Sequence, residues 1–338
     1  MKISASIYSD KSRSLKDVVD DLVQHQVNLL HVDCNDDPSV FNDIKEIRSF
    51  CDLPIDLHLI TSSPEKYFDL LRETPVDYLT IQHESLNHDK FHGFKIPNDL
   101  LCKKGIAITT ETPIEIFESY LDYDFILIMA TVPGQSGGLF DRDNFYKIRK
   151  FRKKYPSKSI HVDGGVNGEV SFILRNLGVS CSVSGSYLFT SPSVGHALFN
   201  LQSRNLGSTY TVSDFMIPIE ECPVITSNES SLKTTLQTIE NGNLGFCLIL
   251  NNDQKLDGLI SSADIRKSLL NNLSDLKNLS VDKMINFNPL TVFDHNTVID
   301  LLKIIKSAKF PVMYLPVVDK DFKAKGIVNF VHLIKGEV

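Results

Sequence analysis

The sequence predicts an α/β chain in two parts, a closed (β/α)8 barrel followed by a smaller α+β module. Over roughly the first 200 residues, short apolar or β-branched runs alternate with helical patterns, and eight such runs can be counted. Strict alternation implies parallel strands joined by right-handed crossovers, and eight units of this kind close into a barrel. The rest of the chain contains an internal repeat of about 70 residues, which indicates a paired module.

The barrel elements follow one another at short intervals. The expected strands are 3–8, 29–34, 55–60, 78–82, 105–109, 125–130, 159–163 and 181–184. The expected helices include 14–26, 40–50, 64–72, 113–120, 143–154 and 169–177. An open doubly wound sheet is the structural competitor, but it usually has a glycine-rich turn after the first strand, and here that turn reads Tyr8-Ser9-Asp10-Lys11.

Composition excludes several classes of protein. The 338 residues suit two domains, and 42% hydrophobic with 23% charged residues is ordinary for a globular protein. A net charge of -7 gives no electrostatic footprint for nucleic acid or for an anionic membrane. No apolar run approaches the roughly 20 residues of a membrane span, and the start of the chain lacks the pattern of a signal peptide. The six cysteines form no C-x-x-C pair, so we expect a cytoplasmic protein with reduced thiols.

Three strand ends carry groups that could bind a metal. In Leu30-His31-Val32-Asp33-Cys34, the spacing of two puts His31 and Asp33 on one face of a strand. Similar patterns place His58 on the strand 55–60 and Asp163 at the end of 159–163. If the strand ends converge, these two imidazoles and two carboxylates suit zinc, iron, manganese or cobalt. Each group alone would more simply be a satisfied polar residue, so the prediction depends on the recurrence.

Glycine clusters follow the last three expected strands. The loops contain Thr131-Val132-Pro133-Gly134-Gln135-Ser136-Gly137-Gly138, Asp163-Gly164-Gly165-Val166-Asn167 and Ser184-Gly185-Ser186. In a barrel of this kind, chemistry belongs at the C-terminal ends of the strands, and glycine lets backbone N–H groups approach a phosphate there, with a helix N-terminus behind them. The sequence therefore predicts a phosphate site formed by these three loops.

Residues 1 to about 200 resemble the ribulose-phosphate 3-epimerase family, whose fold is the TIM barrel. The motifs that carry the resemblance are Ser6-Ile7-Tyr8-Ser9, His31-Val32-Asp33, Asp56-Leu57-His58-Leu59, Gly105-Ile106-Ala107 with Thr112-Pro113, 129–138, 161–167 and Gly185-Ser186. The resemblance implies a metal-dependent isomerase that converts D-ribulose 5-phosphate to D-xylulose 5-phosphate. It implies His31, Asp33, His58 and Asp163 as metal ligands, with Asp33 and Asp163 as the acid/base pair. It also implies substrate contacts from Ser9, Met129, Gly134, Gly137, Gly164, Gly165, Gly185 and Ser186.

The chemistry of epimerisation explains the need for two carboxyl groups. Inverting a carbon next to a carbonyl requires removal of a proton from one face and delivery of a proton to the other, so acid/base groups must flank that carbon. A divalent cation can stabilise the resulting enediolate by several kcal/mol. All four expected ligands are present, which disfavours a non-catalytic sugar-phosphate or nucleotide sensor. Barrels for decarboxylation or aldol chemistry often carry Asp-x-Lys-x-x-Asp, which is absent between His31 and Asp36.

The chain departs from the family around the substrate. Asn35 and Ile60 stand where the family usually has methionine, and the connection from His31 to His58 is shorter than usual. The loop after the sixth strand reads Pro-Gly-Gln-Ser-Gly-Gly instead of the usual Pro-Gly-Phe-Gly-Gly-Gln. A different ketose phosphate, such as a hexulose or heptulose phosphate, is therefore the alternative substrate.

The second part resembles a tandem pair of CBS domains. We expect a barrel over 1–203, a polar linker over 204–210, and CBS motifs over 211–272 and 279–338. In that family a Gly-hydrophobic-hydrophobic-Ser/Thr-x-x-Asp stretch holds the ribose of an adenine nucleotide, and Ser261 and Asp264 match its hydroxyl and carboxylate. The same two residues could instead simply cap the helix that they begin. The second copy lacks both groups, so at most one full nucleotide site is expected. Separately, we expect the protein to form a homo-oligomer.

Overall fold

The protein divides into two compact units, Met1–Leu206 and Gly207–Val331. The computed structural model describes residues 1–87, 95–133, 137–202, 209–229, 231–274 and 279–330. Most of the expected linker, at 204–208, and the end of the second CBS motif, at 331–338, lie outside the described residues. No described helix combines the length and the apolar character needed to cross a bilayer.

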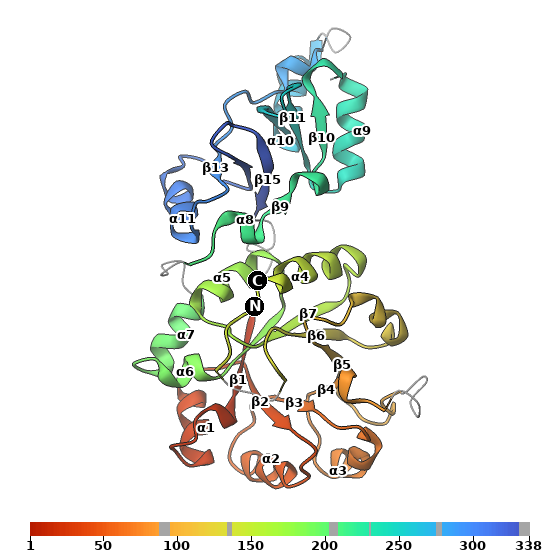
Figure 1. The fold of residues 1–338 in the computed structure, drawn as a ribbon, viewed down its shortest axis with the longest axis vertical. Helices are drawn as coiled ribbons and strands as arrows, with labels where there is room; N and C mark the ends of the chain where they lie inside the picture. Colours follow the sequence, from red (N-terminus) through yellow and green to blue (C-terminus); the bar gives the residue numbers. More distant parts are fainter. Residues whose placement is uncertain (88–94, 134–136, 203–208, 230, 275–278, 331–338) are drawn as a thin grey trace. The chain divides into compact units, whose positions relative to one another are not determined.

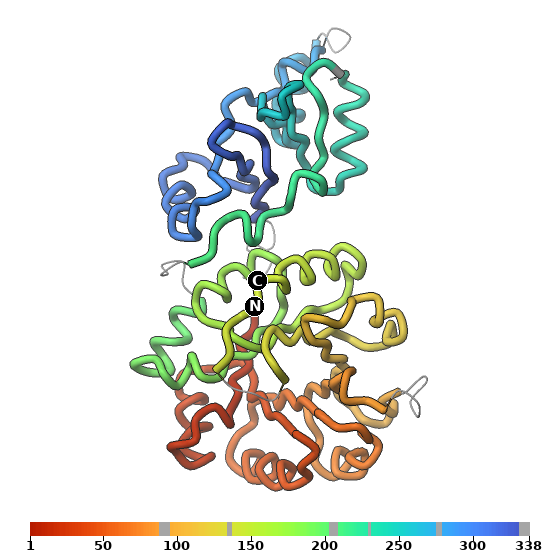
Figure 2. The backbone as a smooth tube through the Cα atoms, in the orientation of Figure 1, coloured from red at the N-terminus to blue at the C-terminus, as the bar shows by residue number. Residues whose placement is uncertain are grey.

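The first unit is the predicted barrel. Its strands lie in sequence order, all parallel, and β8 closes the barrel by pairing with β1 (Figure 1). The strands are β1 (Lys2–Ser6), β2 (Leu29–Cys34), β3 (Ile55–Leu59), β4 (Tyr78–Gln82), β5 (Lys103–Ile108), β6 (Phe125–Met129), β7 (Ser159–Asp163) and β8 (Cys181–Ser184). Four of the eight have the predicted bounds, and the others differ by one or two residues at one or both ends. Figure 2 shows the chain colours advancing once around this barrel.

The connections between barrel strands are α-helices and short 3₁₀ helices. The α-helices are α1 (Leu15–Gln24), α2 (Val40–Arg48), α3 (Phe68–Glu73), α4 (Asp143–Lys154), α5 (Gly168–Asn176), α6 (Ser186–Thr190) and α7 (Val194–Gln202). The 3₁₀ helices are η1 (Ile7–Ser9), η2 (Pro64–Tyr67), η3 (His83–Ser85) and η4 (Ile114–Tyr120). The expected helix 113–120 is thus entirely 3₁₀, and 64–72 is 3₁₀ in its first half, because short connectors readily adopt the tighter winding.

The core of the barrel unit forms between strands and helices. In α1, the Ser14 side chain accepts a hydrogen bond from the backbone N–H of Asp17 and so caps the helix. The helix then buries Val18, Val19 and Leu22. Strands covered on both faces are apolar almost throughout, as in all-parallel sheets. The barrel thereby becomes a rigid support for the polar groups at its strand ends.

The second unit contains two sheets that repeat one pattern. The first has the order β10-β11-β12 and the second β13-β14-β15-β9. In each, a parallel pair (β10 with β11, β13 with β14) is followed by an antiparallel hairpin. The elements are α8 (Val212–Phe215), β9 (Ile217–Pro218), η5 (Ile219–Glu221), β10 (Val224–Thr226), η6 (Ser227–Glu229), α9 (Leu232–Gly242), β11 (Phe246–Leu250), β12 (Leu256–Ser261), α10 (Ser262–Asn271), η8 (Val281–Lys283), β13 (Val292–Phe293), α11 (Val298–Ser307), β14 (Tyr314–Val318) and β15 (Ala324–Asn329). The predicted repeat is confirmed.

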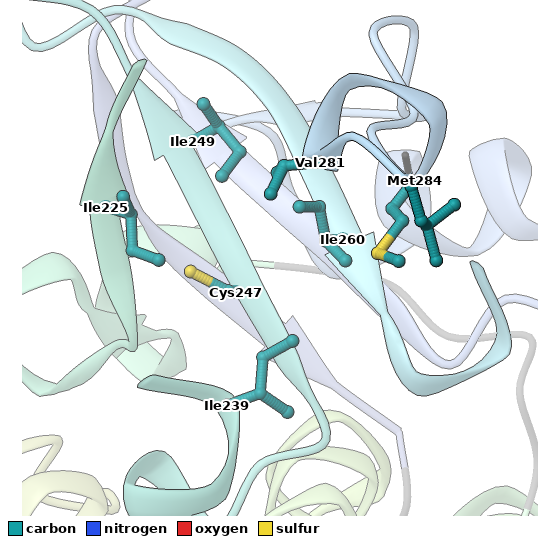
Figure 3. Packing of buried hydrophobic residues seen from close by; sticks show 8 residues of the cluster. Ile225, Ile239, Cys247, Ile249, Ile260, Val281 and Met284 are labelled. Carbon is teal, nitrogen blue, oxygen red and sulfur yellow. The ribbon is translucent and has the colours of Figure 1, made fainter. Parts of the chain in front are cut away.

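Each copy of the repeat contributes a segment to the other. β9, from the first copy, pairs antiparallel with β15 of the second. In return, Asn286 of the second copy bridges Leu259 on β12, with N–H to O distances of 2.9 and 3.0 Å in the two directions. Val281 and Met284, also from the second copy, pack into the apolar core around Ile249 of the first (Figure 3). The two copies are therefore interlocked through both sheet pairing and core packing.

Candidate active site

The barrel brings the four predicted metal-binding side chains together. His31 and Asp33 lie on β2, His58 on β3 and Asp163 at the end of β7, and the register pairs Asp33 with His58. One ligand atom from each of the four lies within 4.8 Å of the others. Both imidazoles are fully buried, whereas the Asp33 and Asp163 side chains are 19% and 18% exposed. Solvent therefore reaches the cluster from the side of its carboxylates and not from the side of its imidazoles.

A buried carboxylate orients His31. Nδ1 of His31 lies 3.0 Å from Oδ2 of Asp56, and that oxygen also accepts a hydrogen bond of 2.8 Å from the Ser4 hydroxyl. Since a carboxylate only accepts, Nδ1 donates. Nε2 then faces the other two carboxylates, 3.3 Å from Asp33 Oδ1 and 3.8 Å from Asp163 Oδ2.

His58 is oriented by an amide. Its Nε2 lies 2.8 Å from Oε1 of Gln82, and its Nδ1 lies 3.2 Å from Oδ1 of Asp33. Each ring thus has one nitrogen held by an outer partner and one directed at the carboxylates, which is the usual arrangement of metal-ligating histidines. Two imidazole nitrogens and two carboxylate oxygens form a donor set that fits zinc, iron, manganese or cobalt.

The pKa values of the two carboxyl groups are shifted in opposite directions. Burial, together with the nearby charge of Asp33, raises the pKa of Asp163 to about 6. Burial also acts to raise the pKa of Asp33, but the charge of His31 and the close contacts that both imidazoles make with its carboxylate hold it well below its usual range. Two carboxyl groups whose pKa values are pushed apart can serve as a proton acceptor and a proton donor in one site.

A cavity of about 410 Å³ opens over these carboxylates, within the usual size range of small-molecule sites. Six of the expected substrate-binding residues line it: Ser9, Gly137, Gly164, Gly165, Gly185 and Ser186. Gly134 lies outside the described residues. Met129 lies in a buried cluster with Ala107, Phe125 and Leu127, and is not among the residues that line the cavity.

The glycine loops pack tightly against one another at the cavity wall. Gly164 has φ +109°, and a Cβ there would lie 2.2 Å from Oγ1 of Thr131 and 2.7 Å from its backbone nitrogen. A Cβ at Gly185 would lie 2.2 Å from Oγ of Ser9. Glycine is therefore required where the loop after β7 meets the loop after β6, and where the loop after β8 meets the loop after β1.

Sequence reasoning missed three groups that the structure places near the site. Asp56 and Gln82 hold the two imidazoles, and Lys11 is the cation among the described residues that line the cavity. Asp56 could have been found, because it shares a strand face with His58 by the same spacing that relates His31 and Asp33. Gln82 required knowledge of the register between β3 and β4.

In the second unit, Ser261 and Asp264 form a capping box at the start of α10. Oδ2 of Asp264 accepts from the Ser261 backbone N–H at 2.9 Å and from its hydroxyl at 2.6 Å. Thr297 and Asp300 form the same box on α11. The capping role that the sequence left open is thus realised, and it occupies only one carboxylate oxygen of Asp264.

Two family models match this chain. Residues 2–189 match the model of the ribulose-phosphate 3 epimerase family, and residues 281–337 match that of the CBS domain. The ribulose-phosphate 3-epimerase of Bacillus subtilis is 26% identical over 201 residues, covering 56% of this chain and 92% of the relative. That of Methanocaldococcus jannaschii is 29% identical over 221 residues, covering 61% and 92%.

Solved structures of CBS proteins are similar to a part of this chain. CBSX2 in complex with AMP is 25% identical, with a TM-score of 0.32, and the match covers 38% of this chain and 96% of that one. A CBS domain pair in complex with 5′-methylthioadenosine and S-adenosyl-L-methionine is 21% identical, with a TM-score of 0.31, covering 37% and 98%.

Proposed function

Since the chain belongs to the ribulose-phosphate 3-epimerase family, we propose that it is a metal-dependent isomerase that inverts C3 of a ketose phosphate, with D-ribulose 5-phosphate and D-xylulose 5-phosphate as its substrate pair. The observation that most directly supports this is that one ligand atom from each of His31, Asp33, His58 and Asp163 lies within 4.8 Å of the others. Two of the four, Asp33 and Asp163, also line a cavity. The match to the Bacillus subtilis epimerase covers 92% of that relative, so the barrel corresponds to nearly a whole enzyme.

The two carboxyl groups carry the proton transfers. Asp33, ionised because its pKa is held low, removes the C3 proton, and Asp163, whose raised pKa lets it hold a proton, returns one to the opposite face. The roles exchange in the reverse direction. His31 and His58 would hold a divalent cation together with these carboxylates. When bound, the cation supplies positive charge beside the oxygens that become negative as the proton leaves.

The glycine loops bind the phosphate end of the substrate. Gly164, Gly165 and Gly185 line the cavity, where glycine lets backbone N–H groups approach a phosphate, and Ser9 and Ser186 line it with hydroxyl groups. Asp33 and Asp163 line the same cavity, which supports a single sugar phosphate that contacts both sets of residues.

A longer ketose phosphate is the second candidate substrate. Asn35, where the family usually has methionine, lines the cavity, and Lys11 lines it as well. These polar groups favour a substrate with more hydroxyl groups than a pentulose.

Incubation with a panel of ketose phosphates in deuterated water tests both candidates. Deuterium should enter at C3 of the accepted sugar, because the proton removed exchanges with solvent. Deuterium at another carbon, or in none of the sugars tried with protein reloaded with Zn²⁺ or Mn²⁺, would contradict the proposal.

We further propose that the CBS pair binds an adenine nucleotide at Ser261 and Asp264 and thereby regulates the barrel. The capping box uses Oδ2 of Asp264, so Oδ1 can accept from a ribose hydroxyl. Asp264→Ala should abolish binding of AMP and ATP to the full chain, measured by calorimetry. Asp300→Ala removes the matching box on α11, which costs about 1 kcal/mol as any cap does, and should leave nucleotide binding intact. Equal nucleotide affinity in both variants would refute the assignment.

A further inference from the structure

The two imidazoles of the site differ in what fixes their ring protons. His31 donates directly to Asp56, a group that can only accept. His58 faces Gln82, whose amide has a donor end and an acceptor end. If that amide turned over, its NH₂ group would face Nε2 and the ring proton would move to Nδ1. Nδ1 is the nitrogen directed at Asp33, so the orientation of one amide decides whether His58 can act as a ligand.

Glu84 fixes that orientation. Nε2 of Gln82 donates to Oε2 of Glu84, and because an ionised carboxylate only accepts, the NH₂ end of the amide must face Glu84. The carbonyl end must then face His58, as the 2.8 Å contact requires. The carboxylate of Glu84 thus acts on His58 through the buried amide of Gln82. His31, in contrast, contacts the carboxylate of Asp56 directly.

Glu84 is itself well anchored. Its Oε1 accepts from the backbone N–H of Thr109 at 2.8 Å and from the Thr112 hydroxyl. Although burial acts to raise it, these hydrogen bonds and the one from Gln82 hold the pKa of Glu84 below its ordinary value. Lys147 on α4 stabilises the turn that supplies these donors. Its ammonium donates to the carbonyls of Thr109 and Thr112 at 2.6 Å each.

We propose that Glu84, acting through Gln82, sets the ring tautomer of His58 and so leaves Nδ1 free to bind a divalent cation. Glu84 and Gln82 are positioning residues, since neither touches the reacting atoms. The inference rests on the proposed metal-dependent function, but its spectroscopic test needs neither metal nor turnover.

The test compares ring nitrogens in the full chain. With ¹⁵N-labelled histidine and metal removed, NMR at mildly alkaline pH should show the His58 proton on Nε2 in the wild type. In Glu84→Gln the amide of Gln82 can turn, so a population with the proton on Nδ1 should appear. The affinity for Zn²⁺ should fall about 10-fold or more, as it does when outer partners of ligand histidines are removed.

Two further variants separate positioning from a general structural role. Thr112→Val removes one donor to Glu84 but keeps the carboxylate, so stability should fall while the His58 nitrogen signals stay as in the wild type. The exchange Gln82→Glu with Glu84→Gln places a carboxylate directly against His58, as Asp56 is placed against His31. This double variant should restore both the Nε2 proton and the zinc affinity.

Three results would overturn the inference: a wild-type proton on Nδ1, unchanged nitrogen signals and zinc affinity in Glu84→Gln, or no recovery in the double variant. A wild type with the expected tautomer that binds no Zn²⁺ would instead refute the proposed metal-dependent function and support the tautomer assignment. The two failures are therefore distinguishable.

Discussion

Asp163→Asn should lower activity and raise stability at the same time. The substitution keeps the size of the side chain and one oxygen, but it removes the group that holds and returns a proton. Loss of one general acid/base group typically costs 10²- to 10⁴-fold in rate, or about 3–5 kcal/mol of transition-state stabilisation. The barrel should remain folded, because Asp163 makes its contacts at an open strand end.

The gain in stability follows from the raised pKa. The unfolded carboxyl titrates near 3.8 and the folded one at about 6, so between these values the folded protein binds more protons. The contribution of Asp163 to stability is therefore fully present below pH 3.8 and is lost as the pH rises through 6. At about 1.4 kcal/mol per pKa unit, the loss amounts to at most about 3 kcal/mol. Asparagine has no charge to bury, so at pH 7.5 the variant should be more stable than the wild type. At pH 3.8 the wild type has not yet lost this stability, so the two proteins should differ little.

Urea unfolding of the metal-stripped proteins at several pH values measures the effect, and coupled assays of epimerisation measure the rate. Asp33→Asn is the matched control, because the pKa of Asp33 is lowered: it should lose activity and also lose stability at pH 7.5. Wild-type activity in Asp163→Asn, or a stability change of the same sign in both variants, would refute the reasoning.

Three further predictions follow from the same structure. Thorough chelation should reduce turnover at least 100-fold, with recovery on adding Zn²⁺ or Mn²⁺, and full activity after chelation would exclude a metal role. Gly164→Ala should destabilise the barrel by about 1–3 kcal/mol and raise KM for the sugar phosphate, because φ is positive and Thr131 blocks the Cβ. Gly137→Ala, with φ +92° but nothing within 4 Å of the Cβ, is the control for the steric clash and should lose less stability than Gly164→Ala. Ile249→Ala, in the core that the two copies of the repeat share, should cost about 2–5 kcal/mol by urea unfolding, and an unchanged midpoint would contradict the packing in Figure 3.

Much of the barrel could be predicted because its signals are local. His31 and Asp33 share a strand face by spacing alone, and strand ends gather at one end of any parallel barrel. The outer partners of the histidines could not be predicted in the same way. Gln82 reaches His58 only because β4 pairs with β3 in one register, and a shift by one residue would turn it to the other face.

The second unit shows a similar limit. Ser261 and Asp264 fit both a ribose-binding motif and a helix cap, since both roles need a hydroxyl and a carboxylate at a helix start. The capping box is visible in the structure, and the sequence alone could not choose between the two roles. The segment expected to be an α-helix over 113–120 forms a 3₁₀ helix instead. The choice between the two windings depends on how a short connector spans the distance between its strands, which the local sequence does not specify.

The reciprocal pairing of β9 with β15 and of Asn286 with Leu259 limits how the second unit can be divided in protein engineering. Neither half could be deleted, duplicated or transplanted by itself, since each would leave an unpaired strand edge behind and carry another one away. A conformational change in one copy would therefore act directly on the backbone of the other through these shared hydrogen bonds.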